Sequence, residues 1–385
     1  MVPHCISIRL SCEKDEILEE DLTGIKVIAA YSDGTLVERT VDWENEMSED
    51  GILYGLVHQE HFEFPFILHR ADPNCLYRDG KYYFIATNNF DGNKSLSVRC
   101  ADTLTDIGNA EEALLLDVNM YPDIKDALWT PEFHEINGKL YIFFAATGGE
   151  FFREAARVMK LRNGGNIMNR DDWEALLVVR KDGTTLCNMG KVISLDMSPF
   201  EYEGNWYAMW SQRQFLPEDQ WAWLYLAQID SKEPWKLISD PICIAKPDYG
   251  WENNHTFVVE GPYAIWNHGK LMITYSGALV DSTYTVGILK LRMGSDILDP
   301  VNWEKGNYPL MSSRSCPDED GAGHNSYVKD TNSLMWNFYH GRKNLTGPRS
   351  SGARRVHFDI DDESMLDVLE AFDLPEEMRT IAVKK

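Results

Sequence analysis

Short apolar and aromatic runs alternate with tight-turn dipeptides along most of the chain. The runs are rich in Val, Ile, Tyr, Phe and Trp, and Asp-Gly, Asn-Gly and Gly-Asn pairs separate them, which favours β-hairpins. Helical periodicity is scarce, and Arg153–Lys160 and Glu363–Phe372 are the segments that best fit a helix. The pattern therefore predicts an all-β protein.

One strand–turn–strand unit recurs five times. Its tight turns fall at Gly80, Gly138, Gly204, Gly269 and near Asn332, so successive turns are 58, 66, 65 and about 63 residues apart. A period of about 60 residues suits four-stranded propeller blades with long loops. Residues 64–385 supply the length of five such blades. We therefore expect a five-bladed β-propeller over residues 63–385.

Residues 1–62 lie outside the repeat. Ile25–Tyr31 leads through Ser32-Asp33-Gly34-Thr35 into a second run that ends at Trp43, which predicts a hairpin with an Asp-Gly turn. This stretch resembles bacterial immunoglobulin-like modules. We expect a small β-sandwich-like module that leans on the propeller, because about 60 residues are few for a free-standing sandwich.

Composition and charge narrow the possible partners. The chain has 61 acidic and 37 basic side chains, a net charge of -24 that repels phosphate backbones and argues against nucleic acid. No apolar run approaches the ~20 residues of a membrane-spanning helix, so no membrane partner is expected. The seven cysteines include no Cys-x-x-Cys pair, which disfavours a disulfide framework or a zinc ribbon.

Five titratable residues precede the five turns by six to nine positions: Asp72, Glu132, Asp196, Glu260 and His324. They occupy nearly one register in the first strand of each blade, and the first strands of a propeller surround its axis. We therefore expect a ring of four carboxylates and one imidazole. Burying like charges together is costly without a functional need, so the ring indicates the functional site.

Several carboxylates on one axis suit glycoside hydrolysis. One carboxylate activates water, while a carboxylic acid stays protonated and donates its proton to the leaving oxygen. A third carboxylate nearby raises the pKa of the acid by charge repulsion. Aromatic residues form 12% of the chain, and their rings suit stacking on sugar faces.

Five short motifs occur in order along the blades: Ala71-Asp72-Pro73, Trp129-Thr130-Pro131-Glu132, Leu195-Asp196, Glu260-Gly261-Pro262 and Gly321-Ala322-Gly323-His324-Asn325-Ser326. Together they resemble glycoside hydrolase family 43, and within it the α-L-arabinofuranosidase-like members. The resemblance covers about residues 64–360. Thr130 and Ala322 depart from the family pattern, which has Ala and Pro there, but the expected functional side chains are in place.

The resemblance implies an inverting mechanism and a role for each of four residues. Asp72 is expected to be the base, Glu260 the acid, and Asp196 the carboxylate that tunes the acid and holds the substrate. No cofactor is required for the chemistry. The resemblance also implies a structural calcium or sodium ion on the propeller axis near His324.

Four further residues are predicted to contact the substrate. Trp129 adjoins the ring and Phe90 follows the second strand of blade one, so both are placed to stack on sugar. Glu132 and Asn325 are expected to form hydrogen bonds with sugar hydroxyls. The predicted partner is an arabinose- or xylose-containing oligosaccharide or polysaccharide.

Other functions stay open at this point. Loops decide between an arabinofuranosidase, a β-xylosidase and an endo-arabinanase on the same scaffold. A non-catalytic carbohydrate-binding propeller is a different class, which the presence of all three carboxylates disfavours; the acidic axis disfavours a protein-binding scaffold. Residues 1–20 do not read as a signal peptide. The immunoglobulin-like resemblance nevertheless favours an extracellular fragment of a secreted bacterial protein.

Overall fold

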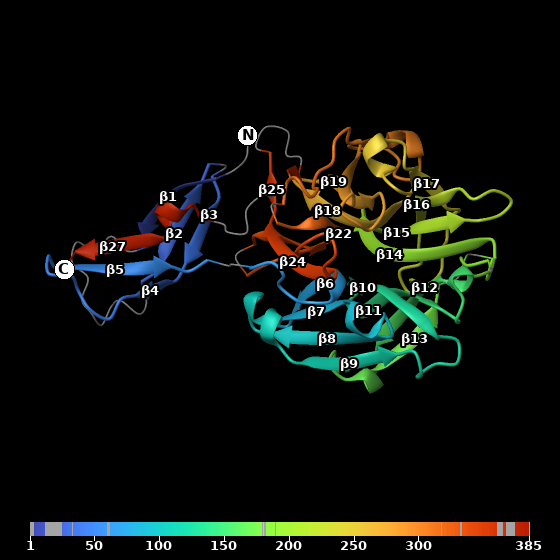
Figure 1. The fold of residues 1–385 in the computed structure, drawn as a ribbon, viewed down its shortest axis with the longest axis horizontal. Coiled ribbons are helices and arrows are strands. Elements are labelled where there is room, and N and C mark those ends of the chain that lie inside the picture. Colours follow the sequence, from blue (N-terminus) through green and yellow to red (C-terminus); the bar gives the residue numbers. More distant parts are fainter. Residues whose placement is uncertain are drawn as a thin grey trace. The chain divides into compact units, whose positions relative to one another are not determined.

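The computed structural model describes residues 4–11, 25–32, 34–59, 62–178, 180, 182–188, 190–316, 318–331, 333–359, 365–366 and 374–384. The regular elements in these ranges are β-strands and short 3-10 helices, as the all-β prediction requires (Figure 1). Two compact units are present. The larger comprises Glu63–Val328 and Trp336–Ala353, and the smaller comprises Met1–Phe62, Lys329–Met335 and Arg354–Lys385.

The larger unit is a five-bladed β-propeller, which confirms the prediction from the repeat. Its strands follow one another within each antiparallel blade, from the innermost strand outward. Blades one and two contain β6 (Arg70–Arg78), β7 (Lys81–Asn88), β8 (Ser95–Ala101) and β9 (Glu112–Asp117), then β10 (Asp126–Ile136), β11 (Lys139–Thr147), β12 (Ala155–Leu161) and β13 (Trp173–Leu177).

Blades three and four have the same four-stranded order. They contain β14 (Val192–Tyr202), β15 (Asn205–Gln214), β16 (Trp221–Gln228) and β17 (Ile242–Ala245), then β18 (Val259–Asn267), β19 (Lys270–Gly277), β20 (Thr285–Leu291) and β21 (Trp303–Lys305). Blade five is a three-stranded sheet of β22 (Asp320–Lys329), β23 (Met335–Arg342) and β24 (Ser350–Arg355).

The start of the propeller pairs with its last blade. The N–H of Phe66 donates to the carbonyl of Ser351 at 2.8 Å, and the N–H of Ser351 donates to the carbonyl of Ile67 at 2.9 Å. The segment before β6 therefore covers the outer edge of β24, whose N–H and C=O groups would otherwise be unpaired. This pairing joins the first and last blades.

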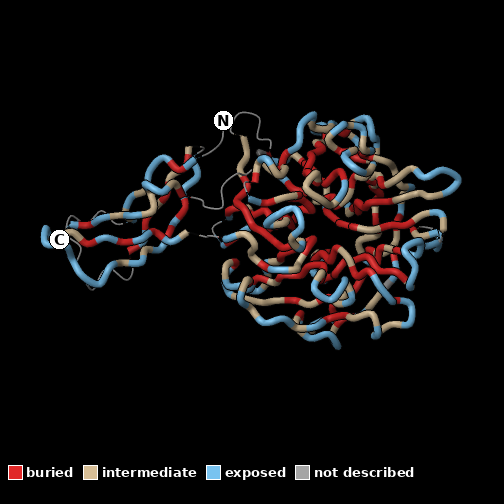
Figure 2. Tube along the Cα trace, viewed as in Figure 1, coloured by how far each residue is buried: buried red, intermediate tan, exposed pale blue. Residues whose placement is uncertain are grey.

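Apolar side chains fill the spaces between neighbouring blades. One cluster joins blades one and two through Ile85, Phe144 and Trp173. A second joins blades two and three around Trp210, and a third joins blades three and four around Tyr275. Figure 2 shows the buried trace concentrated on the inner strands of the larger unit and the exposed trace on its outer loops. The inner strands are thus held firmly enough to fix polar side chains on the axis.

The smaller unit consists mainly of two three-stranded sheets. One sheet contains β1 (Cys5–Leu10), β2 (Val27–Tyr31) and β3 (Leu36–Arg39). The other contains β27 (Thr380–Lys384), β5 (Ile52–Val57) and β4 (Val41–Trp43). They share an apolar cluster that includes Val27, Val37 and Val57. A short pair of strands, β25 (His357–Phe358) and β26 (Met365–Leu366), accompanies them.

The C-terminal residues group differently from the sequence-based boundary. That boundary assigns residues 354–385 to the propeller, whereas in the structure they belong with the smaller unit, because β27 pairs with β5. Thr380 lies opposite Leu56. The two residues are so far apart in the sequence that no local pattern predicts their pairing. The immunoglobulin-like assignment of residues 1–62 stays a prediction.

The helix predicted over Arg153–Lys160 is wrong. Residues Ala155–Leu161 form β12, which pairs with both β11 and β13. Its apolar run is buried on both faces, and a short run of this kind does not distinguish a strand from a helix by periodicity. The other helical candidate, Glu363–Phe372, lies largely outside the described residues, and its described part forms β26.

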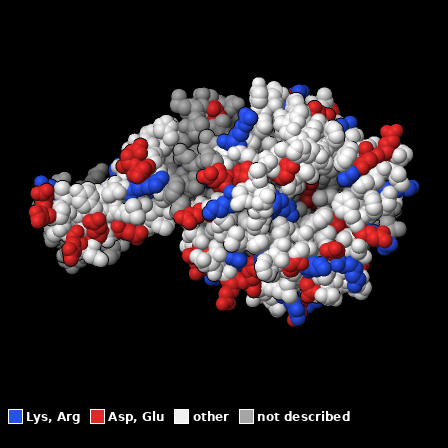
Figure 3. All heavy atoms as spheres, in the orientation of Figure 1, with Lys and Arg blue, Asp and Glu red and all other residues white. Residues whose placement is uncertain are grey.

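Within the described ranges, no helix is long and apolar enough to cross a membrane. The six cysteines described are all free. On the face drawn in Figure 3, acidic and basic side chains are interspersed over both units.

Candidate active site

The innermost strand of every blade carries one residue with a positive φ at the same place. These residues are Asp72 (50°), Thr130 (50°), Asp196 (55°), Gly261 (57°) and His324 (55°). In the first four blades the pairing with the second strand shifts here, as in a β-bulge. A left-handed non-glycine residue costs about 1–3 kcal/mol and is typical of functional sites. These five positions mark the axial ring.

The ring therefore differs in two positions from the sequence-predicted one. The register predicted Glu132 and Glu260 as ring members, whereas Thr130 and Gly261 occupy the equivalent positions. Glu132 lies two residues after Thr130, and Glu260 lies one residue before Gly261. A bulge re-aims the side chains beside it, so a carboxyl one position out of register still reaches the axis.

Asp72 is a buried carboxylate surrounded by positive or polar nitrogen groups. Its Oδ1 lies 3.3 Å from Nη1 of Arg349, 3.0 Å from Nδ1 of His340 and 3.5 Å from Nδ1 of His324. Burial raises the pKa of Asp72, but Arg349 and the two histidines outweigh it and hold that pKa well below its usual range. Asp72 is therefore ionised at neutral pH, as a base requires.

The pKa of Glu260 is shifted in the opposite direction to that of Asp72. Burial, followed by the negative charge of Asp196, raises the pKa of Glu260 to about 7. The Tyr284 hydroxyl donates a 2.8 Å hydrogen bond to Oε1 of Glu260 and fixes the orientation of the carboxyl group. Below about pH 7 Glu260 thus keeps its proton, while Asp72 has already lost its own. This pair of states suits an acid and a base.

Asp196 interacts electrostatically with both Asp72 and Glu260. The backbone N–H of Gly261 donates a 3.0 Å hydrogen bond to its Oδ2, while its Oδ1 is buried without a protein partner. Burial and the charge of Asp72 raise the pKa of Asp196. The free Oδ1 is the kind of group that a substrate hydroxyl satisfies.

His324 belongs to the ring as predicted, and its ring nitrogen faces Asp72 rather than a set of metal ligands. Burial lowers the pKa of His324, but Asp72, Asp196 and Glu260 outweigh it, so the pKa is raised. Among the described residues, no group of three or more His, Cys, Asp or Glu is arranged to hold a metal ion. The axial ion near His324 stays a prediction, and no chemical step is assigned to it.

The predicted substrate contacts lie in different surroundings. Glu132 is buried and pairs through Oε2 with Nε2 of His134 at 2.6 Å. Asn325 is also buried, and its amide nitrogen donates to Oδ1 of Asn337 at 2.9 Å, while its own Oδ1 has no partner. Asn325 therefore contacts the neighbouring strand β23, and no described contact places it beside the carboxylates.

The two predicted stacking rings lie at the end of the propeller from which the innermost strands start. Phe90 belongs to the 3-10 helix η2 (Asn89–Asp91) after β7, and its ring is 77% exposed. Trp129 lies one residue before the ring position Thr130 and contacts Phe151 with ring centroids 6.3 Å apart. Phe151 contacts Phe215 at 6.0 Å. These half-exposed rings extend from the ring of polar residues toward the surface.

Three functional candidates escape detection in the sequence: Arg349, His340 and Tyr284. Arg349 lies in the loop before β24, and it also donates through Nε to Oδ1 of Asn89 at 3.0 Å. His340 accepts a hydrogen bond from the N–H of Asp72 and stacks on Tyr284, with centroids 5.4 Å apart. They come from loops and second strands, where the five-fold register gives no signal.

One further buried carboxyl group lies near the site. Glu154 is fully buried, and neither of its carboxyl oxygens has a hydrogen-bond partner. Burial raises the pKa of Glu154 well above its usual value, and the negative charge of Asp196 adds to this effect. Arg157 opposes this effect, but burial dominates and favours the neutral form of Glu154.

Comparison with known proteins identifies the family. The family model described as "Glycosyl hydrolases family 43" matches residues 62–362. An extracellular exo-α-(1→5)-L-arabinofuranosidase of Streptomyces chartreusis is 30% identical over 280 residues, which are 72% of this chain and 81% of that protein. The α-L-arabinofuranosidase 43 of Humicola insolens is 28% identical over 70% of this chain, but the match spans only 53% of its own length.

A similar solved structure is also that of an arabinofuranosidase. The α-L-arabinofuranosidase of Lactobacillus brevis superposes with a TM-score of 0.69 at 26% identity, covering 78% of this chain and 94% of that one. The matched region includes all five blades and every residue of the axial ring. The chain belongs to family 43 of the glycosyl hydrolases.

Proposed function

We propose that the propeller hydrolyses α-L-arabinofuranosidic bonds with inversion and releases arabinofuranosyl groups from plant cell-wall polysaccharides or their oligosaccharides. The observation that carries the proposal is the contrast between two carboxyl groups of the site. Asp72 has a pKa well below its usual range, and Glu260 has a pKa of about 7. Near neutral pH the site thus holds one ready base and one ready acid.

In the proposed reaction, Asp72 accepts a proton from a water molecule as that water attacks the anomeric carbon. Glu260 gives its proton to the glycosidic oxygen that leaves with the rest of the glycan. Arg349 keeps Asp72 ionised, and Tyr284 keeps the Glu260 carboxyl group in position. Water attacks from the face opposite the departing oxygen, so the anomeric configuration inverts. These residues need no cofactor to complete the step.

Asp196 has two parts in this scheme. Its charge keeps Glu260 protonated, and its unpartnered Oδ1 accepts a hydrogen bond from a sugar hydroxyl. Glu132, on the same axis, is a second group for sugar hydroxyls. The assignment of Asp196 rests on its unpartnered oxygen, because a buried oxygen without a protein donor is costly until a ligand supplies one. The assignment of Glu132 rests on its burial beside the ring.

The choice of arabinose rests on the relatives. The Streptomyces, Humicola and Lactobacillus proteins are all named arabinofuranosidases. The aromatic side chains Trp129, Phe151 and Phe215 would contact the part of the glycan that leaves. We propose arabinan or arabinoxylan as the source of this glycan. An extracellular site of action is proposed because the Streptomyces relative is named extracellular.

A panel of substrates tests the proposal. The protein is incubated with the 4-nitrophenyl glycosides of α-L-arabinofuranose, β-D-xylopyranose and α-L-arabinopyranose, and with arabinan and arabinoxylan. The account predicts hydrolysis of the arabinofuranoside and release of free arabinose from at least one polymer. Faster cleavage of the xyloside, or binding of the polymers without any product, would contradict it.

A further inference from the structure

A hollow lies among blades two, three and four, further along the innermost strands than the catalytic residues. Its volume is about 350 Å³, and the ends of β10, β14 and β18 surround it. Ser198 lines it two residues after Asp196, and Tyr263 lines it three residues after Glu260, on the same strands. β10, β14 and β18 each carry residues beside the ring and, further along, residues that line this hollow, so the two sites lie at successive positions along the same strands.

Trp266 separates this hollow from another one. The neighbouring hollow has a volume of about 410 Å³ and reaches the turn at Gly269 and the side chain of Met293. Trp266 and Glu201 line both hollows, and Trp266 is 38% exposed. We call the two hollows together the Trp266 groove. Each volume lies in the range of about 300–1,000 Å³ that is typical of small-molecule sites.

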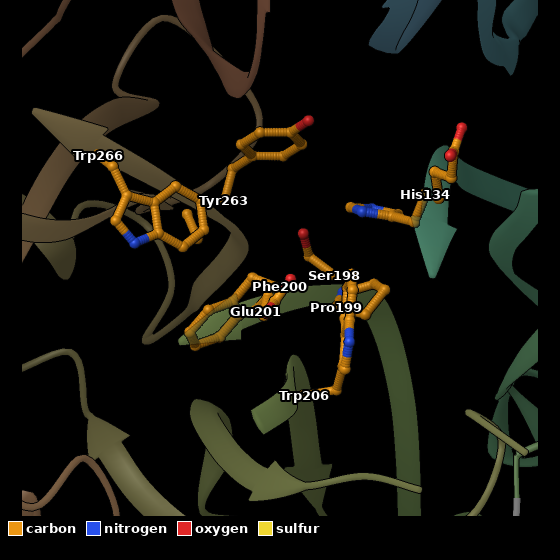
Figure 4. Close-up of a pocket in the computed structure, with 10 residues that line it drawn as sticks. His134, Ser198, Pro199, Phe200, Glu201, Trp206, Tyr263 and Trp266 are labelled. Carbon is orange, nitrogen blue, oxygen red and sulfur yellow. The ribbon is translucent and has the colours of Figure 1, made fainter. Parts of the chain in front are cut away.

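Aromatic rings form one wall of the Trp266 groove. Figure 4 shows Trp266, Tyr263 and Phe200 around the same space, with His134 across it. The rings of Phe200 and Trp266 support one another, with centroids 6.0 Å apart. An indole that packs against a neighbouring ring and stays 38% exposed is suited to stacking on a sugar ring.

Polar groups at the groove select a neutral ligand. His134 is held by Glu132 through the 2.6 Å contact, and Ser198 adds a hydroxyl at the inner end. Glu135 and Glu201 line the groove as carboxylates, Glu135 in an ion pair with Arg78 at 3.3 Å, and the described residues that line the groove include no lysine or arginine. Such a surface repels anionic polymers and accepts hydroxyl donors.

We propose that the Trp266 groove binds a neutral segment of a plant glycan, with one sugar ring stacked on Trp266. The groove would hold a chain on the propeller while the catalytic end acts on another part of it or on its neighbour. The choice of an arabinose-bearing glycan rests on the proposed function. The groove itself, its aromatic wall and its acidic lining do not depend on the proposed function.

Affinity electrophoresis in native gels containing arabinan or arabinoxylan tests the proposal. Trp266→Ala should weaken retention by about three- to tenfold, the size expected for the loss of one stacked ring. Trp266→Phe keeps a ring and should restore most of the retention. Tyr308→Ala, at an aromatic residue that is 83% exposed and lies outside the groove, is the matched control and should migrate as the unaltered protein does.

A second variant guards against a folding defect. Glu201 is exposed, so Glu201→Arg should fold normally while its long side chain fills the groove, and it should reduce retention as Trp266→Ala does. Hydrolysis of a nitrophenyl arabinofuranoside should be unchanged in both variants. Undiminished retention in both would overturn the proposal. A protein that binds the polymers through Trp266 but cleaves no arabinofuranoside would instead overturn the proposed function and leave the groove in place.

Discussion

The backbone N–H of Gly261 donates a 3.0 Å hydrogen bond to Oδ2 of Asp196, so blades three and four meet beside Glu260, the proposed acid. Gly261 directly follows Glu260, and the bond fixes Asp196 beside that residue. A side chain at position 261 would bring a Cβ within 2.9 Å of Nδ1 of His324. The glycine in the Glu-Gly-Pro motif therefore allows close packing against His324.

Asp196→Asn should change the pH dependence of kcat/KM on the alkaline side. Activity requires protonated Glu260, so it falls as pH rises through the pKa of about 7. Asn keeps an oxygen for the Gly261 N–H but removes the charge that raises this pKa. The alkaline limb should move to lower pH, by about one unit.

The pH profile of Glu174→Gln is the control for this shift, because Glu174 is a half-exposed carboxyl on the outer strand β13 of blade two. An alkaline limb that does not move in Asp196→Asn would exclude Asp196 as the tuning group.

The acid and the base should respond differently to the leaving group. Glu260→Gln should lower kcat/KM on arabino-oligosaccharides by at least ~10²-fold and spare much of the rate on a dinitrophenyl arabinofuranoside, whose leaving group needs little protonation. Asp72→Asn should lower both rates alike, because water attacks in each case. Equal losses on both substrates in Glu260→Gln would transfer the role of acid to Glu132 or Asp196.

Arg349 should set the acid limb of the same profile. Its guanidinium lies 3.3 Å from Oδ1 of Asp72 and helps to keep the pKa of that carboxyl low. In Arg349→Met the pKa of Asp72 should rise, so activity should be lost at a higher pH as the solution is acidified, by about one unit or more. Arg349→Lys keeps the charge and should retain most of the original limb. Superimposable acid limbs for the Met variant and the unaltered protein would show that Arg349 acts only as a structural residue.

The repeat in the sequence was enough to predict the propeller and most of its axis. Turn glycines at a nearly constant spacing fix the number of blades, and a strand that leads to such a turn fixes which residue meets the axis. Asp72, Asp196 and His324 were placed correctly for this reason. Glu132 and Glu260 were two and one positions out of register, because the ring residues all precede their turns by eight positions, whereas Glu132 and Glu260 precede theirs by six and nine.

Other features depend on contacts between distant segments. Arg349 meets Asp72 across 277 positions, and β27 meets β5 across more than 300. Side chains on loops such as Arg349, and on second strands such as His340, share no register with the ring. Their importance follows only from the folded arrangement. The burial of Glu154, which raises its pKa, is likewise set by packing that the sequence does not show.

The central claim is hydrolysis by inversion with Asp72 as base and Glu260 as acid. Proton NMR of an α-L-arabinofuranoside, recorded within the first minutes after a large amount of enzyme is added, tests it most directly. The account predicts that β-L-arabinofuranose appears first and that the α anomer and other forms follow by mutarotation. An initial product with the α configuration would show a retaining mechanism and contradict the account.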